Sequence, residues 1–183
     1  PADCEMDPAI VTHANYAGAI EGALRALPAL SLVADPGNLW DADYGIYYNP
    51  NEKDGVPGSR PDPLNKKWER PISLEWIDPN GGPGFFENGG ARIHGNASKR
   101  PYRTAKRPFR LFFKASYGSS RLDFEPFAGT ADAAAKFEQM VLKTNGNRQW
   151  LWNDRDQRRE TDYANDETAR RLFLLMGGIS ARG

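Results

Sequence analysis

Residues 89–117, GGARIHGNASKRPYRTAKRPFRLFFKASY, have the pattern of a strand, a basic loop and a second strand. The first strand is a short run centred on Ile93, and the second, residues 109–113, is aromatic and favours β structure. Between them lie a GNAS turn and five positive charges within residues 99–107. Such a loop suits an anion such as a phosphate group, whereas a solvated basic loop is the ordinary outcome for a charge run. Composition alone leaves both interpretations open.

The preceding segment predicts a neighbouring strand. Residues 68–78, WERPISLEWID, alternate apolar and polar side chains, with Ile72, Leu74 and Trp76 on one face. An Asn-Gly pair at residues 80–81 is the strongest hairpin signal in the chain. We therefore expect a half-buried strand, a tight turn, and another strand that leads into residues 89–117.

Further elements are expected on both sides of this hairpin. Apolar residues at helical spacing predict an amphipathic helix over residues 15–27, ended by Pro28. Residues 29–34 form an apolar run that predicts a short buried strand. Residues 137–144, FEQMVLKT, predict one more strand.

A last helix is expected to begin at Asp162 or Asn165 and to end before Gly177. Its inward side should carry Ala169, Leu172, Phe173 and Met176. The predicted fold class is α+β: a mostly antiparallel sheet with a helix at each end.

Length and composition limit the kinds of partner and site that the chain can be expected to have. The 183 residues suit one domain or part of a larger one, and 24 basic side chains balance 24 acidic ones. Global charge therefore gives no argument for nucleic acid, and no partner of that kind is expected. Cys4 is the only cysteine, which rules out an intrachain disulfide and a cysteine-based metal site. No run approaches the ~20 apolar residues of a membrane-spanning helix, so no membrane span is expected.

Several common catalytic motifs are missing from the sequence. It contains no Gly-x-Ser-x-Gly elbow, no Walker-type P-loop and no Gly-x-Gly-x-x-Gly loop. Their absence argues against an ordinary hydrolase, NTPase or kinase and leaves an atypical kinase open. His94 is the only histidine near a motif, and we expect it to be structural, so no metal ligand is predicted.

Three pieces of the chain, in order, carry a resemblance. The first is DYGIY (43–47) followed by WERP (68–71), the second is RIHGNAS (92–98) followed by KRPFRLFF (106–113), and the third is VLK (141–143) followed by DETARRL (166–172). From about Leu30 to Gly177 the chain resembles the CotH spore-coat kinase family, in particular its large secreted bacterial members. On this basis residues 1–28 are a lead-in with a helix, and residues 29–183 are the N-terminal portion of a CotH-like domain.

The resemblance implies the front part of an atypical kinase-like fold that transfers phosphate from ATP, with Mg or another divalent metal, to Ser or Thr of extracytoplasmic proteins. It also implies an extracellular or cell-surface location. The catalytic aspartates would lie beyond Gly183, so the piece would be inactive alone. A cut through such a core would leave an apolar sheet face uncovered, and we then expect self-association.

Kinase chemistry needs a basic residue on the phosphates, held by a carboxylate. The predicted cofactor-binding residues are, in chain order, Arg92, Asn96, Ser98, Lys106, Arg110, Lys143 and Glu167. Lys106 with Glu167 is the first pairing considered, and Lys143 is the alternative lysine. For Glu167 the competing interpretation is a first-turn residue that stabilises its helix, and for Asn96 and Ser98 it is turn chemistry alone.

A second function class fits the aromatic residues of the chain. Aromatic side chains on a β surface can stack on sugar rings or anchor a protein partner. The candidates are Trp40, Tyr44, Tyr47, Tyr48, Trp68 and Trp76. They favour a non-enzymatic extracellular binding or structural module as the alternative to a kinase.

Overall fold

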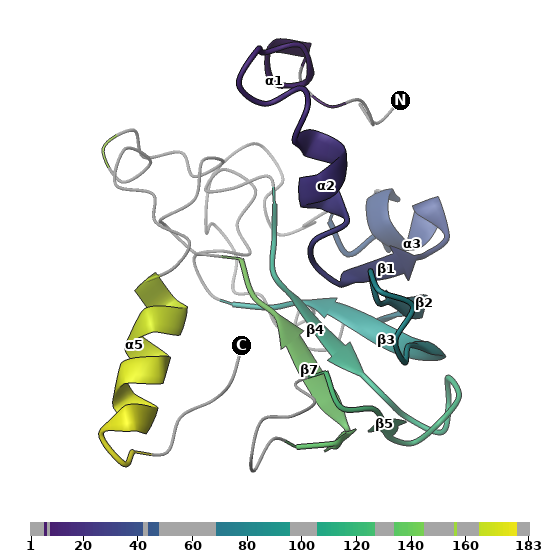
Figure 1. Ribbon diagram of the computed structural model, residues 1–183. Coiled ribbons are helices and arrows are strands. Elements are labelled where there is room, and N and C mark those ends of the chain that lie inside the picture. Colours follow the sequence, from purple (N-terminus) through teal and green to yellow (C-terminus); the bar gives the residue numbers. More distant parts are fainter. Residues whose placement is uncertain are drawn as a thin grey trace. The chain divides into compact units, whose positions relative to one another are not determined.

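The computed structural model describes residues 6, 8–41, 44–47, 69–95, 106–126, 134–144, 156 and 165–178. They form an α+β structure with few helices and a mostly antiparallel five-stranded sheet in the order β1-β2-β3-β4-β7 (Figure 1). The predicted α+β class and the mostly antiparallel sheet are confirmed.

The strands of the large sheet are β1 (Ala29–Val33), β2 (Arg70–Ile77), β3 (Phe85–Ile93), β4 (Phe109–Phe112) and β7 (Gln139–Leu142). A two-stranded sheet pairs β5 (Leu122–Asp123) with β6 (Lys136–Phe137). The helices are α1 (Pro8–Val11), α2 (Ile20–Leu24), α3 (Pro36–Trp40) and α5 (Asn165–Leu175). None of the helices in the described ranges is long and apolar enough to cross a membrane.

The chain divides into two compact units. The smaller comprises Pro1–Leu32 and Leu74–Phe86, and the larger comprises Val33–Ser73 and Glu87–Gly183. Every contact described below for the candidate site lies within the larger unit. The domain boundary predicted between residues 28 and 29 stays a prediction.

Strand register gives the sheet one apolar face. In the antiparallel pairs, Leu111 lies opposite Ala91 on β3 and opposite Met140 on β7, and Phe109 lies opposite Ile93. Side chains of register partners point to the same face, and successive residues alternate between faces. Leu111, Ala91 and Ile93 are all buried, so this face belongs to the core. The residues between them therefore point to the opposite face.

The hairpin predicted from the sequence is confirmed. Leu74 on β2 is fully buried and Glu75 is exposed, as the alternation predicts. Gly81 has φ of +72°, a left-handed conformation that glycine adopts without steric cost. The Asp78 carboxylate accepts hydrogen bonds from the backbone N–H of Asn80 (2.8 Å) and of Gly82 (3.1 Å), which closes the turn. β2 and β3 are accordingly neighbours in the sheet.

The amphipathic helix predicted over residues 15–27 is wrong in extent. Only α2, Ile20–Leu24, is an α-helix there, and none of its residues is buried. Its N-cap, Ala19, offers no side-chain acceptor, and Gly18 and Gly22 lower helix propensity by about 1 kcal/mol each relative to alanine. Apolar residues at helical spacing were therefore not enough to form a helix over residues 15–27, because the segment has no side-chain cap and buries none of its helical residues.

Two predicted strands also need correction. The strand over residues 29–34 exists as β1, but it lies at the sheet edge and is half-exposed rather than buried. The strand over residues 137–144 is divided at Glu138 into β6 and β7, which belong to different sheets. At the break, the backbone N–H of Phe113 donates to the Glu138 carbonyl at 2.9 Å, so β4 keeps its neighbour.

The last helix begins at Asn165 and ends before Gly177, whose φ is +80°, and both predicted limits are confirmed. The predicted inward side is wrong, because Leu172, Phe173 and Met176 are all exposed. Helical spacing shows that a helix is amphipathic, but not which surface covers it.

Candidate functional site

The polar face of the sheet brings together two of the predicted site residues. Arg92 on β3 lies in register with Arg110 on β4, so both guanidinium groups are carried on the face opposite the buried Leu111. Like charges opposite one another destabilise a strand pair unless other groups compensate. Among the described residues no carboxylate forms an ion pair with Arg110. The positive charge of Arg110 therefore has no described counter-ion, and the arginine pair can attract an anion.

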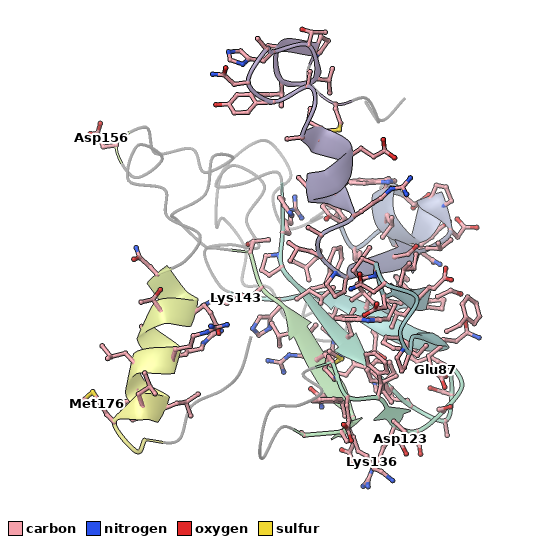
Figure 2. The ribbon with its side chains drawn as sticks, in the orientation of Figure 1. Glu87, Asp123, Lys136, Lys143, Asp156 and Met176 are labelled. Atoms are coloured by element: carbon pink, nitrogen blue, oxygen red, sulfur yellow. The ribbon has the colours of Figure 1, made fainter. Side chains whose placement is uncertain are left out.

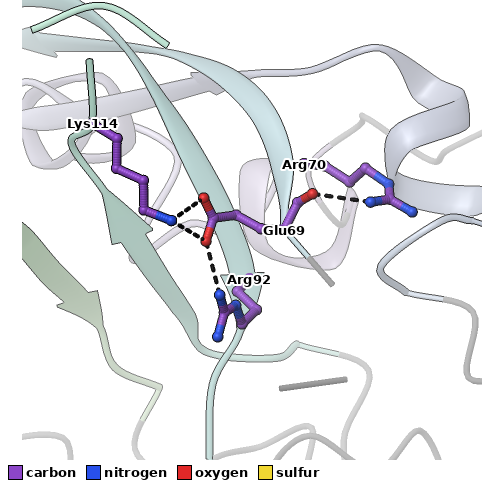
Figure 3. Close-up of polar contacts among 4 residues, drawn as sticks. All are labelled: Glu69, Arg70, Arg92 and Lys114. Carbon is purple, nitrogen blue, oxygen red and sulfur yellow. Dashed lines mark hydrogen bonds and ion pairs between the residues drawn. The ribbon is translucent and has the colours of Figure 1, made fainter. Parts of the chain in front are cut away.

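A carboxylate compensates Arg92. Glu69, which directly precedes β2, has a side chain only 8 % exposed and accepts a hydrogen bond from Arg92 Nη2 at 2.9 Å (Figure 3). Lys114, just after β4, donates to both carboxylate oxygens of Glu69, at 2.7 Å and 2.9 Å. One buried carboxylate thus holds two cations from two different segments.

The ring of Phe112 supports both of these cations. Arg92 Cζ lies 4.7 Å from the ring centroid and Lys114 Nζ lies 4.6 Å from it. A cation within about 6 Å of an aromatic face is attracted by the ring quadrupole. Phe112 is buried although it points to the polar face, because the two cations cover it. We call Arg92, Arg110 and Lys114 the basic face.

Tyr117 completes the surroundings of Glu69. Burial raises the pKa of the Tyr117 hydroxyl, and its hydrogen bond to the Glu69 carboxylate raises it further. Burial also opposes ionisation of Glu69, but hydrogen bonds from Lys114, Tyr117 and Arg92 outweigh it and lower the pKa of Glu69. The carboxylate is therefore ionised at neutral pH. We call Glu69, Arg92, Lys114 and Tyr117 the Glu69 cluster.

Gly90 leaves the space that the Glu69 cluster occupies. A Cβ at this position would lie 2.6 Å from Tyr117 Cε2 and 2.7 Å from Glu69 Oε1. We expect Gly90→Ala to displace both side chains and to lower the free energy of unfolding by about 1–3 kcal/mol in urea denaturation. Gly118→Ala is the control, since a Cβ there would meet its nearest atom at 3.5 Å. Equal urea midpoints for the two variants would contradict this placement of Glu69 and Tyr117.

His94 lies beside the basic face, and the two predicted lysines are exposed residues. His94 lies two residues beyond Arg92, and its backbone N–H donates to the Pro108 carbonyl at 2.8 Å. Burial lowers the pKa of His94, and the charge of Arg110 lowers it further, so the imidazole is neutral at pH 7. Lys143 directly follows β7 (Figure 2) and Lys106 precedes β4, and both residues are exposed. The structure thus places Arg92, Arg110 and His94 together, whereas none of the contacts described here joins Lys106 or Lys143 to them.

The remaining predicted residues divide into two groups. Asn96 and Ser98 lie outside the described residues. Glu167 accepts a hydrogen bond from Arg171 Nε at 2.7 Å, one turn along the same helix. This contact matches the helix-stabilising interpretation of Glu167, and the structure provides a different carboxylate for the basic face.

Sequence reasoning missed Glu69 and Lys114. Glu69 was part of the WERP motif, but nothing local shows that it lies beneath residues 92 and 114. Lys114 could have been found, because Arg110, Phe112 and Lys114 are spaced by two, the spacing that puts side chains on one face of an extended segment. The ion pair between Lys114 and Glu69 could not have been found in this way, because the two residues are 45 positions apart and meet only through the strand register.

Within the described ranges, no group of three or more His, Cys, Asp or Glu side chains is placed to hold a metal ion. The arrangement is instead that of an anion site: cations fixed by a buried carboxylate beside an arginine without a described counter-ion. No protein-family model, no curated protein and no solved structure matches this chain.

Proposed function

We propose that this chain is the nucleotide-side portion of a CotH-like atypical protein kinase, and that its basic face binds the phosphates of ATP. In this proposal the complete domain is secreted by a bacterium and transfers phosphate to Ser or Thr of extracytoplasmic proteins. The aspartates that act on the metal and the acceptor belong to a further part of the domain. We assign no metal ligand to the described residues.

One observation carries the proposal: Glu69 fixes Lys114 and Arg92 on the sheet face from which Arg110 also extends. Kinases hold a strand lysine with a carboxylate so that its ammonium group meets the phosphates. Here Lys114 with Glu69 supplies such a pair in place of the predicted Lys106 with Glu167. Among the described residues, Arg110 adds a third cation to the two that Glu69 holds, and such an excess of positive charge suits a polyphosphate.

Arg110→Gln should weaken binding of Mg-ATP and of tripolyphosphate about tenfold or more, because a hydrogen bond from a charged group to a phosphate contributes roughly 1.5–3 kcal/mol. Isothermal titration calorimetry at low ionic strength measures the change directly. Raising the salt concentration should weaken wild-type binding further, since the face is partly exposed.

Arg121→Gln is the matched control for this experiment. Arg121 is exposed and pairs with Glu138 at 2.9 Å, away from the register of Arg92 and Arg110. Its loss should leave the affinity unchanged. A wild-type chain that binds neither ligand, or equal losses for both arginine variants, would remove the basic face from the proposal.

A non-enzymatic binding module remains the second candidate, favoured by the exposed aromatic rings of Trp40 and Tyr44. The rings of Trp40 and Tyr47 pack in a tilted arrangement with centroids 4.3 Å apart, and Arg70 lies over Tyr44. Trp76 is half-buried, and Tyr48 and Trp68 lie outside the described residues. Loss of protein or glycan binding in Trp40→Ala, together with no nucleotide binding by the wild type, would favour this module.

A further inference from the structure

A groove of about 490 Å³ opens next to the Glu69 cluster. Its sides come from the segment between β1 and α3 and from the turn after β4, and its base from β2 and β3. All of its lining residues belong to the larger unit of the chain. Small-molecule sites in proteins usually have volumes of roughly 300–1,000 Å³, so this groove is large enough for a ligand.

The groove is lined by neutral hydrogen-bonding groups. Asn38, Ser73, Asn88, Ser116 and Tyr117 all contribute to it, and no lysine or arginine is among the described residues that line it. The lining includes one carboxylate, Asp35, whose Oδ1 already accepts from the backbone N–H of Gly37 at 2.7 Å as the cap of α3. Among these described lining residues an anionic ligand would therefore meet a carboxylate and no cation.

Several of these groups have hydrogen-bonding capacity left for a ligand. Ser73 Oγ donates to Asn88 Oδ1 at 2.8 Å, which leaves the amide N–H donors of Asn88 and the lone pairs of Ser73. Within the described part of the chain, the side chains of Asn38 and Ser116 make no hydrogen bond. An apolar ligand would desolvate all of these groups without pairing them, which is unfavourable.

We propose that the groove binds a neutral saccharide of one or two rings. Sugar hydroxyl groups both donate and accept, so they pair with the amide of Asn88 and the hydroxyls of Ser73 and Ser116. The half-buried ring of Tyr117 at the groove offers an apolar surface for the C–H face of a sugar. This site is separate from the basic face and does not depend on phosphate binding there.

The proposal is tested by ligand-observed NMR on the whole chain with maltose, cellobiose and lactose. Glucuronic acid and adenosine serve as the charged and nucleoside comparisons. At least one neutral disaccharide should bind. Asn88→Ala and Ser116→Ala should each weaken that binding about three- to tenfold, the loss expected for one or two hydrogen bonds.

Ser120→Ala is the matched control, because Ser120 lies in the same exposed turn but does not line the groove. It should leave the affinity unchanged. Ser116 is exposed, so its variant tests the site even where Asn88→Ala disturbs β3. The proposal is overturned by no disaccharide binding at tens of millimolar concentration, by binding that both variants leave intact, or by binding of adenosine or glucuronic acid alone.

Discussion

Glu69→Gln is expected to lower the free energy of unfolding by about 2–3 kcal/mol, although the two side chains have the same shape. The carboxylate is 8 % exposed and accepts hydrogen bonds from Arg92 and Lys114. An amide would keep one acceptor oxygen and would turn its N–H₂ group toward a cation. The loss is moderated because Arg92 and Lys114 are 26 % and 46 % exposed and can still reach water.

Glu69→Gln should also make the free energy of unfolding depend less on pH in the acidic range. Because folding lowers the pKa of Glu69, its ionised form stabilises the native state above the ordinary value of 4.5, and this contribution is lost as the pH falls through the lower native pKa. Wild-type stability should therefore decline below about pH 4.5, and the glutamine variant should lose this component of the decline. Urea denaturation at a series of pH values measures both curves.

Glu138→Gln is the control for Glu69→Gln. Glu138 also pairs with an arginine at 2.9 Å, but its side chain is 64 % exposed. Exposed ion pairs contribute about 0–1 kcal/mol, so the variant should be close to the wild type. Equal destabilisation by the two substitutions would mean that Glu69 is an ordinary surface residue.

Leu111→Ala should destabilise the chain by about 3–4 kcal/mol, more than the loss expected from Glu69→Gln. Leu111 is fully buried on β4, between Ala91 on β3 and Met140 on β7. Truncation removes buried apolar surface and leaves a cavity that the paired backbones cannot close. In urea denaturation the midpoint concentration should fall, because β4 packs less well in the core. The slope of the free energy of unfolding against urea concentration should stay the same.

Val141→Ala is the comparison for Leu111→Ala. Val141 is also on the sheet, but it is exposed on the face of Arg110. Its truncation should cost under about 1 kcal/mol. Similar losses at both positions would contradict the assignment of Leu111 to the core face and, with it, the assignment of Arg110 to the opposite face.

The sequence predicted the elements whose signals are local. Alternation identified β2, the Asn-Gly turn identified the hairpin, and Gly177 marked the end of α5. It failed where packing decides. Leu24 is exposed in a helix shorter than predicted, and Glu138 separates two strands that read as one. The spacing of apolar residues predicts which side of a helix or strand is apolar, but not which other element packs against that side.

The candidate site was predictable in part for the same reason. Arg92 and Arg110 could be named from a basic hairpin, because antiparallel strands joined by a loop place such residues near one another. Glu69 could not, since its contact with Lys114 requires the register of three strands. Nor does sequence spacing show that Gly90 leaves the room for Glu69 and Tyr117 above the sheet.

The central claim is that the basic face presents the guanidinium groups of Arg92 and Arg110 to phosphate. The most direct test follows the side-chain Nε–Hε resonances of these two arginines by ¹H–¹⁵N NMR during a titration with Mg-ATP. Our account predicts that both resonances shift together and saturate with one dissociation constant, while the resonance of Arg121 stays in place. Saturable binding of Mg-ATP that leaves Arg92 and Arg110 unshifted, or no binding, would contradict it.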